Sequence, residues 1–316
     1  MTGRDGPRFA AIRGISDFAD ERKKLIEDKY RGAFRQVAIA NAATFLWASI
    51  QSDLFSEQWR SSAVATTGGL RLRSQFAGFL NSTEIIFQHR NKPVIDLSDL
   101  FVYPDLLSVR GTATQRVNSK QLSDLKALSQ FTLVIGDAQS GKTSLSKTLF
   151  RAYLRQGAFP LFITGNQLKN TRYDFIVNSS FDHEYEGMSL QAAVAAHKPS
   201  VLIVDDYQNT GLNKEHQQSF FKHIAKRFDH VITVGSNDVR RIDTKFATFS
   251  EFQSFELLPF GHTLRHELVS RWVRLGQEET MSEPDFVQRL DVCDQHVESV
   301  LRKDIVPPPD HFTYVR

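Results

Sequence analysis

The sequence predicts an α/β fold, with a parallel sheet that is covered by helices on both faces. Three observations in residues 118–260 predict it. Short apolar runs alternate with helical stretches, a glycine-rich loop joins one run to a helix, and another run ends in two aspartates. Strands and helices in alternation need crossover connections, and these make neighbouring strands parallel.

The first 117 residues have a different character. Residues 1–55 begin with the apolar run FAAIRGISDFAD, which is followed by a long helical pattern. Residues 56–117 are rich in Ser, Thr and Gly at first and then hold two apolar pieces, so they predict a connector.

The central region, 118–260, holds the expected sheet. Its strand candidates are residues 131–135, 159–164, 201–204, 231–234 and 255–258. Its helix candidates are residues 142–155, 188–197 and 214–227. Residues 261–303 are expected to be helical, so a C-terminal helical subdomain should follow the sheet.

The clearest motif is GDAQSGKTS, which lies between the first of these strands and the helix after it. Its glycine spacing predicts backbone N–H groups that surround a phosphate at the N-terminus of a helix. Lys142 would reach the β- and γ-phosphates, and the Thr143 hydroxyl would bind Mg²⁺. The predicted nucleotide-binding residues are Gly136, Asp137, Ala138, Gln139, Ser140, Gly141, Lys142, Thr143 and Ser144.

A second motif, SVLIVDDYQN, is an apolar run that ends in two carboxylates. We expect Asp205 to hold Mg²⁺ through water and Asp206 to polarise the attacking water. With Lys142, these two aspartates are the predicted catalytic residues. By itself, a strand that ends in Asp-Asp is often only a turn.

Polar residues also follow the next two strands. Asn237, after Ser236, is expected to sense the γ-phosphate, as are the cations Arg240 and Arg241. Arg265, close to His262, follows the fifth strand and is a further sensor candidate. For each of these residues, a solvated turn or helix start is the alternative.

Composition narrows the class of protein. The formal net charge is +3, and the basic excess lies in residues 1–110. The neutral remainder predicts no dedicated nucleic-acid binding. Cys293 is the single cysteine, which favours a reducing compartment, and we expect a cytoplasmic protein. No apolar run is long enough for a membrane span, and the histidines lack metal-ligand spacing, so Mg²⁺ rather than zinc is expected.

The two motifs resemble those of P-loop NTPases. The pieces LSDLFVYPDL, VIGDAQSGKTSL, VLIVDDYQN and LPFGHTLRHELVSRWVRLG resemble the STAND class of signalling NTPases, relatives of NACHT and AP-ATPase proteins. The resemblance implies binding of ATP or GTP, slow Mg²⁺-dependent hydrolysis, and a nucleotide-controlled switch in bacterial defence or stress signalling. It also implies self-association or a partner chain.

Residues 9–52 resemble the C-terminal end of a purine nucleoside phosphorylase or methylthioadenosine/adenosylhomocysteine nucleosidase domain. In that family the aspartate matching Asp17 donates a proton to the purine N7, and Ser16 would orient it. The resemblance covers a strand and a helix only, so we interpret Ser16 and Asp17 as relics of such a site and expect no nucleosidase activity from this chain alone.

The expected domains follow from these resemblances. They are a truncated phosphorylase-like tail (1–55), a connector (56–117), a P-loop NTPase domain (118–260) and a helical subdomain that looks truncated (261–316). Two alternative functions remain open. One is glycosidic bond cleavage regulated by the NTPase, and the other is a nucleotide-binding interaction module without turnover.

Overall fold

The computed structural model describes residues 70–85, 89–110, 113–239, 249, 251–277 and 280–304. The chain divides into two compact units, Met1–Ser62 and Ala63–Arg316, and every described residue belongs to the second. The expectations for residues 1–55, Ser16 and Asp17 included, therefore lie outside the described residues. In the described part, no helix is both long and apolar enough to cross a membrane.

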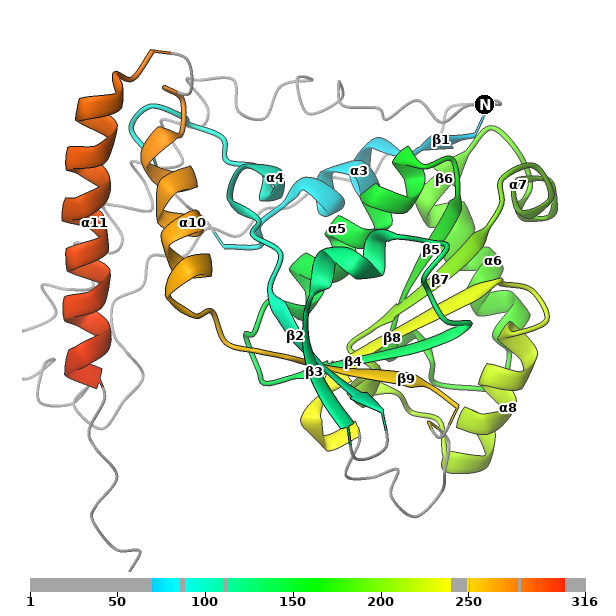
Figure 1. Cartoon of the computed structure of the whole chain (residues 1–316). Coiled ribbons are helices and arrows are strands. Elements are labelled where there is room, and N and C mark those ends of the chain that lie inside the picture. The colour runs from blue at the N-terminus through cyan, green and yellow to red at the C-terminus, as the bar shows by residue number, and fades with distance from the viewer. Residues whose placement is uncertain are drawn as a thin grey trace, which may run out of the picture. The chain divides into compact units, whose positions relative to one another are not determined.

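A seven-stranded sheet forms the centre of this unit (Figure 1). Its strand order is β3-β2-β9-β4-β8-β7-β5. The five strands from β9 to β5 are parallel, whereas β2 pairs antiparallel with both β3 and β9. The bounds are β2 (Asp105–Arg110), β3 (Ala113–Asn118), β4 (Phe131–Gly136), β5 (Phe159–Thr164), β7 (Ser200–Asp205), β8 (His230–Ser236) and β9 (Gln253–Leu257).

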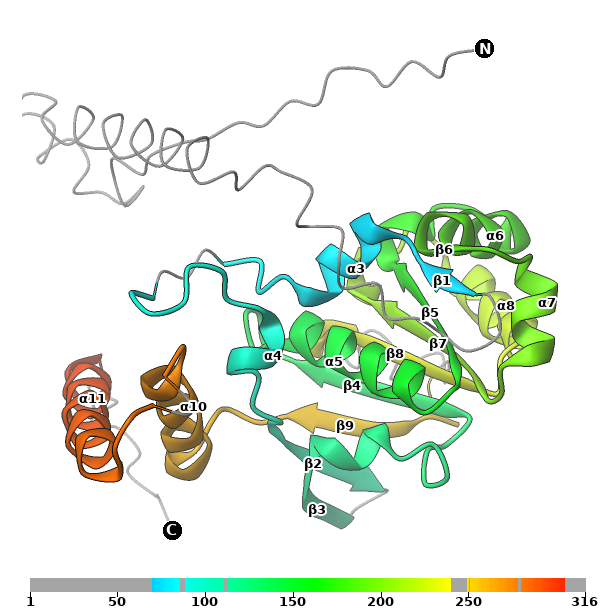
Figure 2. The same cartoon turned by 90° about the horizontal axis from the view of Figure 1, so that it is seen from above.

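Helices cover both faces of the sheet (Figures 1 and 2), which confirms the predicted fold class. Helices α3 and α5 pack together on one face, while α8 lies on the other. A small second sheet pairs β1 (Arg71–Leu72) with β6 (Tyr185–Glu186). The helices are α3 (Ser74–Asn81), α4 (Leu97–Leu100), α5 (Lys142–Arg155), α6 (Tyr173–Glu184), α7 (Leu190–Ala196), α8 (Lys214–Ile224), α10 (His262–Arg274) and α11 (Glu283–Asp304).

The strands and helices predicted within residues 118–260 all form, and α5 has the expected bounds. The hairpin β2–β3 was not expected, because residues 105–118 fall mostly in the segment interpreted as a connector. The β3 sequence, ATQRVN, is polar, and the described side chains at its centre are exposed. An edge hairpin of this kind lacks the apolar pattern that predicts a strand.

Aromatic side chains fill the layers between the sheet and its helices. On the α5 face, the Phe76 ring lies 5.3 Å from that of Phe150 and 6.3 Å from that of Phe162. On the α8 face, the Phe221 ring lies 5.0 Å from that of Phe252 and 6.3 Å from that of Phe131. These aromatic contacts pack helices against both faces of the sheet.

A buried lysine ties the segment after α3 to α5. Lys147, on α5, has a side chain that is only 1% exposed. Its Nζ lies 2.7 Å from Glu84 Oε1, donates to the Ser82 carbonyl at 3.1 Å, and stands 4.1 Å from the centre of the Phe79 ring. A buried cation needs such partners, so the segment that holds Ser82 and Glu84 is fixed beside α5.

Candidate functional site

The glycine-rich loop joins β4, a central strand, to α5 at the carboxyl end of the sheet. Gly141 caps α5 with a φ of 87°, a left-handed conformation that favours glycine. At Gly136 a Cβ would lie 2.8 Å from Ser140 Oγ and 3.1 Å from Leu257 Cβ, so a larger residue there would force these side chains to shift. The loop therefore directs the first N–H groups of α5 toward the space beyond the strand ends.

Lys142 lies within this loop. It is only 8% exposed. Its Nζ donates to the Gly136 carbonyl at 3.1 Å and also to the Asp137 carbonyl. The ammonium group is thus held at the mouth of the loop, at the position where a cation can contact a bound phosphate.

Asp205 ends β7 and faces the first turn of α5. It is 2% exposed, and its carboxylate accepts hydrogen bonds from the hydroxyls of Thr143 and Ser146, the latter at 3.2 Å. Burial raises the pKa of Asp205 to about 6, although the Thr143 hydrogen bond lowers it and the neighbouring charge of Asp206 raises it. The two residues predicted to hold the metal, Thr143 and Asp205, are therefore in contact.

These residues fit Mg²⁺. A magnesium ion in a phosphate site takes one or two protein oxygens and completes its shell with phosphate oxygens and water. Thr143 and Asp205 supply a hydroxyl and a carboxylate of this kind. Among the described residues, no three His, Cys, Asp or Glu side chains gather as a self-sufficient metal site.

Replacing Asp205 with asparagine is expected to stabilise the chain without nucleotide. The rise of the Asp205 pKa from 3.8 to about 6 corresponds to a cost of roughly 3 kcal/mol for the ionised form. This cost is absent below the pKa of Asp205 in the unfolded chain. It develops as pH rises from that value through the pKa of Asp205 in the folded chain, and it is complete above the latter. In chemical unfolding with EDTA, we expect Asp205→Asn to gain about 2 kcal/mol at about pH 8 and little at about pH 4.

Asp229 provides a control, because its replacement with asparagine should change the stability in the opposite direction. Burial raises the pKa of this carboxyl, but hydrogen bonds from the Ser200 N–H and hydroxyl, at 2.8 and 2.9 Å, leave it lower than usual. Its ionised form therefore stabilises the fold above the unfolded pKa, and this stabilisation is lost as pH falls. Asp229→Asn should lose stability at high pH. A loss of stability in Asp205→Asn at high pH would contradict the raised pKa of Asp205.

Asp206 and Asn237 lie at the ends of the adjacent strands β7 and β8. Asp206 has a φ of 51°, a left-handed conformation that aspartate tolerates. Asn237 donates through Nδ2 to Asp137 Oδ1 at 2.7 Å, which joins the predicted sensor to the glycine-rich loop. The buried Asn237 Oδ1 and Ser140 Oγ have no hydrogen-bond partner among the described residues, so two polar atoms near the loop are available to a ligand.

Arg265 is engaged elsewhere. Its guanidinium donates to the Phe260 carbonyl and to Glu298 Oε1, both at 3.0 Å, and His262 Nδ1 lies 3.1 Å from the same Glu298 oxygen. These contacts join α10 to α11, and Arg265 does not line the cavity beside the loop. Arg240 and Arg241 lie outside the described residues.

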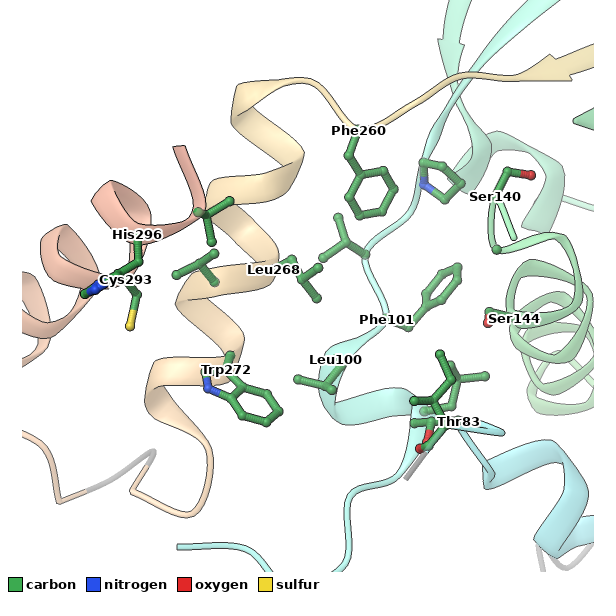
Figure 3. A pocket seen from close by; sticks show the side chains of 17 residues that line it. Thr83, Leu100, Phe101, Ser140, Ser144, Phe260, Leu268, Trp272, Cys293 and His296 are labelled. Carbon is green, nitrogen blue, oxygen red and sulfur yellow. The ribbon is translucent and has the colours of Figure 1, made fainter. Parts of the chain in front are cut away.

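A cavity of about 600 Å³ adjoins the loop (Figure 3). Ser140, Gly141 and Ser144 form one wall, while Phe260 and Trp272 approach from the α10 side. Phe101 lies between this side and the wall that holds Ser144. The other lining residues are Thr83, Ile85, Leu97, Leu100, Val102, Pro104, Leu268, Val269, Cys293, His296 and Val297. The cavity is mostly apolar and aromatic, with hydroxyl groups next to the loop, so it suits a flat ring attached to a phosphate chain.

Sequence reasoning named none of the cavity's aromatic residues. Phe101 lies in the piece LSDLFVYPDL, and Phe260 and Trp272 lie in LPFGHTLRHELVSRWVRLG. Both pieces resemble the STAND class, and they lie on either side of the expected sheet in the sequence. Aromatic residues in these two flanking pieces were the available signal.

No protein-family model matches the chain, and no curated protein matches it. Among solved structures, it is similar to AMPPCP-bound DnaA from Aquifex aeolicus, at 14% identity and a TM-score of 0.36, over 59% of this chain and 62% of that one. It is also similar to domain III of the Thermotoga maritima replication initiation protein DnaA, at 13% identity and a TM-score of 0.35, over 60% of this chain and 84% of that one. It is similar as well to the Aeropyrum pernix ORC1 protein in complex with DNA, at 9% identity and a TM-score of 0.33, over 58% of this chain and 59% of that one.

The chain thus spans less than two thirds of the Aquifex DnaA and ORC1 chains that it resembles. Similarities with TM-scores this low support no inference about what this chain binds, and the expectation that it is not a dedicated nucleic-acid binder stays a prediction. The chain's own geometry is more informative. A mostly parallel sheet with helices on both faces carries a glycine-rich loop at the end of a central strand. This is a P-loop NTPase fold.

Proposed function

We infer that the chain binds ATP in the glycine-rich loop and hydrolyses it slowly with Mg²⁺. The observation that carries this proposal is the contact between Thr143, at the start of α5, and the buried carboxylate of Asp205, with Lys142 held in the same loop. Lys142 and the N–H groups of the loop bind the phosphates. Thr143 and Asp205 hold Mg²⁺, which would neutralise charge on the β- and γ-phosphate oxygens.

Hydrolysis needs an activated water. Asp206 orients this water and takes a proton from it as the new O–P bond forms at the γ-phosphate and the bond to the bridging oxygen breaks. ADP and inorganic phosphate are the products. Asn237, which already contacts Asp137 of the loop, is suited to contact the γ-phosphate and thus to distinguish ATP from ADP.

We also propose that the chain acts as a STAND-type signalling switch. The cavity is lined by the loop and also by α10 and α11, so a bound nucleotide would contact both parts. Loss of the γ-phosphate can then change how α10 and α11 pack beside the loop. A role in bacterial defence or stress signalling, with self-association or a partner chain, rests on the sequence resemblance.

The base is expected to be adenine. Guanine carries three N–H donors, at N1 and at its 2-amino group, whereas adenine carries two, both on its 6-amino group. No Asp or Glu is among the described residues that line the cavity, so guanine would leave more donors without an acceptor. Donors buried without an acceptor cost about 1–3 kcal/mol, so GTP should bind roughly tenfold or more weakly than ATP. Calorimetric titration of the full chain with each nucleotide and Mg²⁺ measures this difference.

A pair of variants tests whether the cavity holds the base. Phe101→Ala should weaken ATP binding roughly tenfold, because base–aromatic stacking contributes about 1–3 kcal/mol. Phe175→Ala is the control, since Phe175 lies on α6 and is 69% exposed. Failure of the wild-type chain to bind either nucleotide would overturn the proposed function, whereas equal affinities for ATP and GTP would overturn only the choice of base.

A further inference from the structure

Gln208 connects the proposed catalytic aspartate to the end of the neighbouring strand. It lies in the short 3-10 helix Tyr207–Asn209, directly after β7. Its Nε2 donates to Asp206 Oδ1 at 3.1 Å, and its Oε1 accepts from the N–H of Ser236 at 2.9 Å. One amide therefore uses both of its ends to join two strands at their carboxyl edge.

The backbone around Gln208 is shaped for this contact. At Gly235, on β8, a Cβ would lie 3.2 Å from Gln208 Oε1 and 2.8 Å from Val239 Cγ2, so the glycine leaves room for the amide. The left-handed conformation of Asp206 is held by a hydrogen bond from the Asn209 N–H to the Asp206 carbonyl at 2.9 Å. Gln208 then fixes the side chain of Asp206, whose backbone is already set.

Ser236 connects the Gln208 bridge to the glycine-rich loop. Ser236 precedes Asn237, which donates to Asp137 of the glycine-rich loop. The bridge thus links the loop, the sensor at the end of β8 and Asp206 through consecutive hydrogen bonds. Because Gln208 donates to Asp206 Oδ1, the orientation of this carboxylate is restrained through one of its two oxygens.

We propose that Gln208 is a positioning residue for ATP hydrolysis. It orients the Asp206 carboxylate toward the attacking water and fixes the position of this carboxylate relative to Asn237. The inference rests on the proposed function. A misplacement of a catalytic group by about 1 Å can cost on the order of 100-fold in rate. The Gln208 amide bonds to Asp206 and to the Ser236 N–H, which lie outside the glycine-rich loop. The role therefore predicts a loss of kcat without a loss of ATP affinity.

The test separates the two ends of the amide. Gln208→Glu keeps an acceptor for the Ser236 N–H but replaces the donor to Asp206 with a negative charge, and Gln208→Met removes both bonds at similar size. Both variants should lower kcat at least roughly tenfold, while the Kd for ATP changes less than about twofold. The control is Gln217→Glu on α8, since Gln217 Nε2 donates to the Leu212 carbonyl, at 2.9 Å, and not to the proposed site.

The readouts are steady-state phosphate release, calorimetric ATP binding and thermal unfolding of the full chain. Unchanged kcat in Gln208→Glu, with wild-type turnover present, would overturn the role of Gln208 and leave the proposed function intact. A wild-type chain that binds ATP but releases no phosphate would overturn both the hydrolytic step and this role. A parallel loss of ATP affinity and thermal stability would show a structural role instead.

Discussion

Lys142→Ala is expected to lower the affinity for ATP about 100-fold. The charge-assisted hydrogen bonds of a lysine to phosphate contribute about 1.5–3 kcal/mol, and alanine leaves phosphate oxygens in the loop without this cation. In the structure, Lys142 Nζ donates to loop carbonyls, so the variant loses contacts that shape the loop as well. Calorimetry with ATP and Mg²⁺ measures the change.

Lys126→Ala is the matched control, since Lys126 is exposed and lies away from the loop, before β4. It changes the net charge by the same amount, so any general electrostatic effect on a polyanionic ligand appears in both variants. Equal ATP affinity in Lys142→Ala and the wild type would contradict nucleotide binding in this loop.

Asp206→Asn is expected to lower the rate of phosphate release by about 100-fold or more, because positioned general bases contribute on the order of 10²–10⁴. Asparagine has nearly the same shape, and its oxygen can still accept from Gln208, so ATP affinity should stay within about twofold. Single-turnover phosphate release with saturating ATP and Mg²⁺ measures the chemical step directly.

Asp182→Asn serves as the control for this variant, since Asp182 is an exposed residue of α6. Release that is present in the wild type and lost in Asp206→Asn excludes the alternative of a nucleotide-binding module without turnover. Wild-type release that persists in Asp206→Asn would assign the base to another residue. No release from the wild type, with ATP bound, would favour the module.

The sequence predicted the parallel strands and the loop because both depend on local patterns. The run FTLVI, two glycines at fixed spacing and an amphipathic helix are readable without any partner, and β4, the loop and α5 form at those residues. The pairing of Thr143 with Asp205 was also predictable, since carboxyl ends of parallel strands meet at one edge of a sheet.

Other parts depended on contacts between distant residues. The hairpin β2–β3 is polar, and it becomes part of the sheet only because β2 pairs with β9, about 150 residues later in the chain. Arg265 was a sensor candidate from its position after the fifth strand, yet Glu298 of α11 binds its guanidinium. No local pattern reveals which acidic residue a surface arginine will meet.

By itself, then, the sequence determined the glycine-rich loop, its lysine and the two aspartates after the apolar run, because glycine geometry and strand-end chemistry are encoded within a few consecutive residues. Only the tertiary structure decided what surrounds them. The aromatic cavity takes Phe101 from one segment and Phe260 and Trp272 from another, and Gln208 bridges two strands that are paired by the sheet. Such contacts arise from packing, which depends on the whole folded unit rather than on neighbours in sequence.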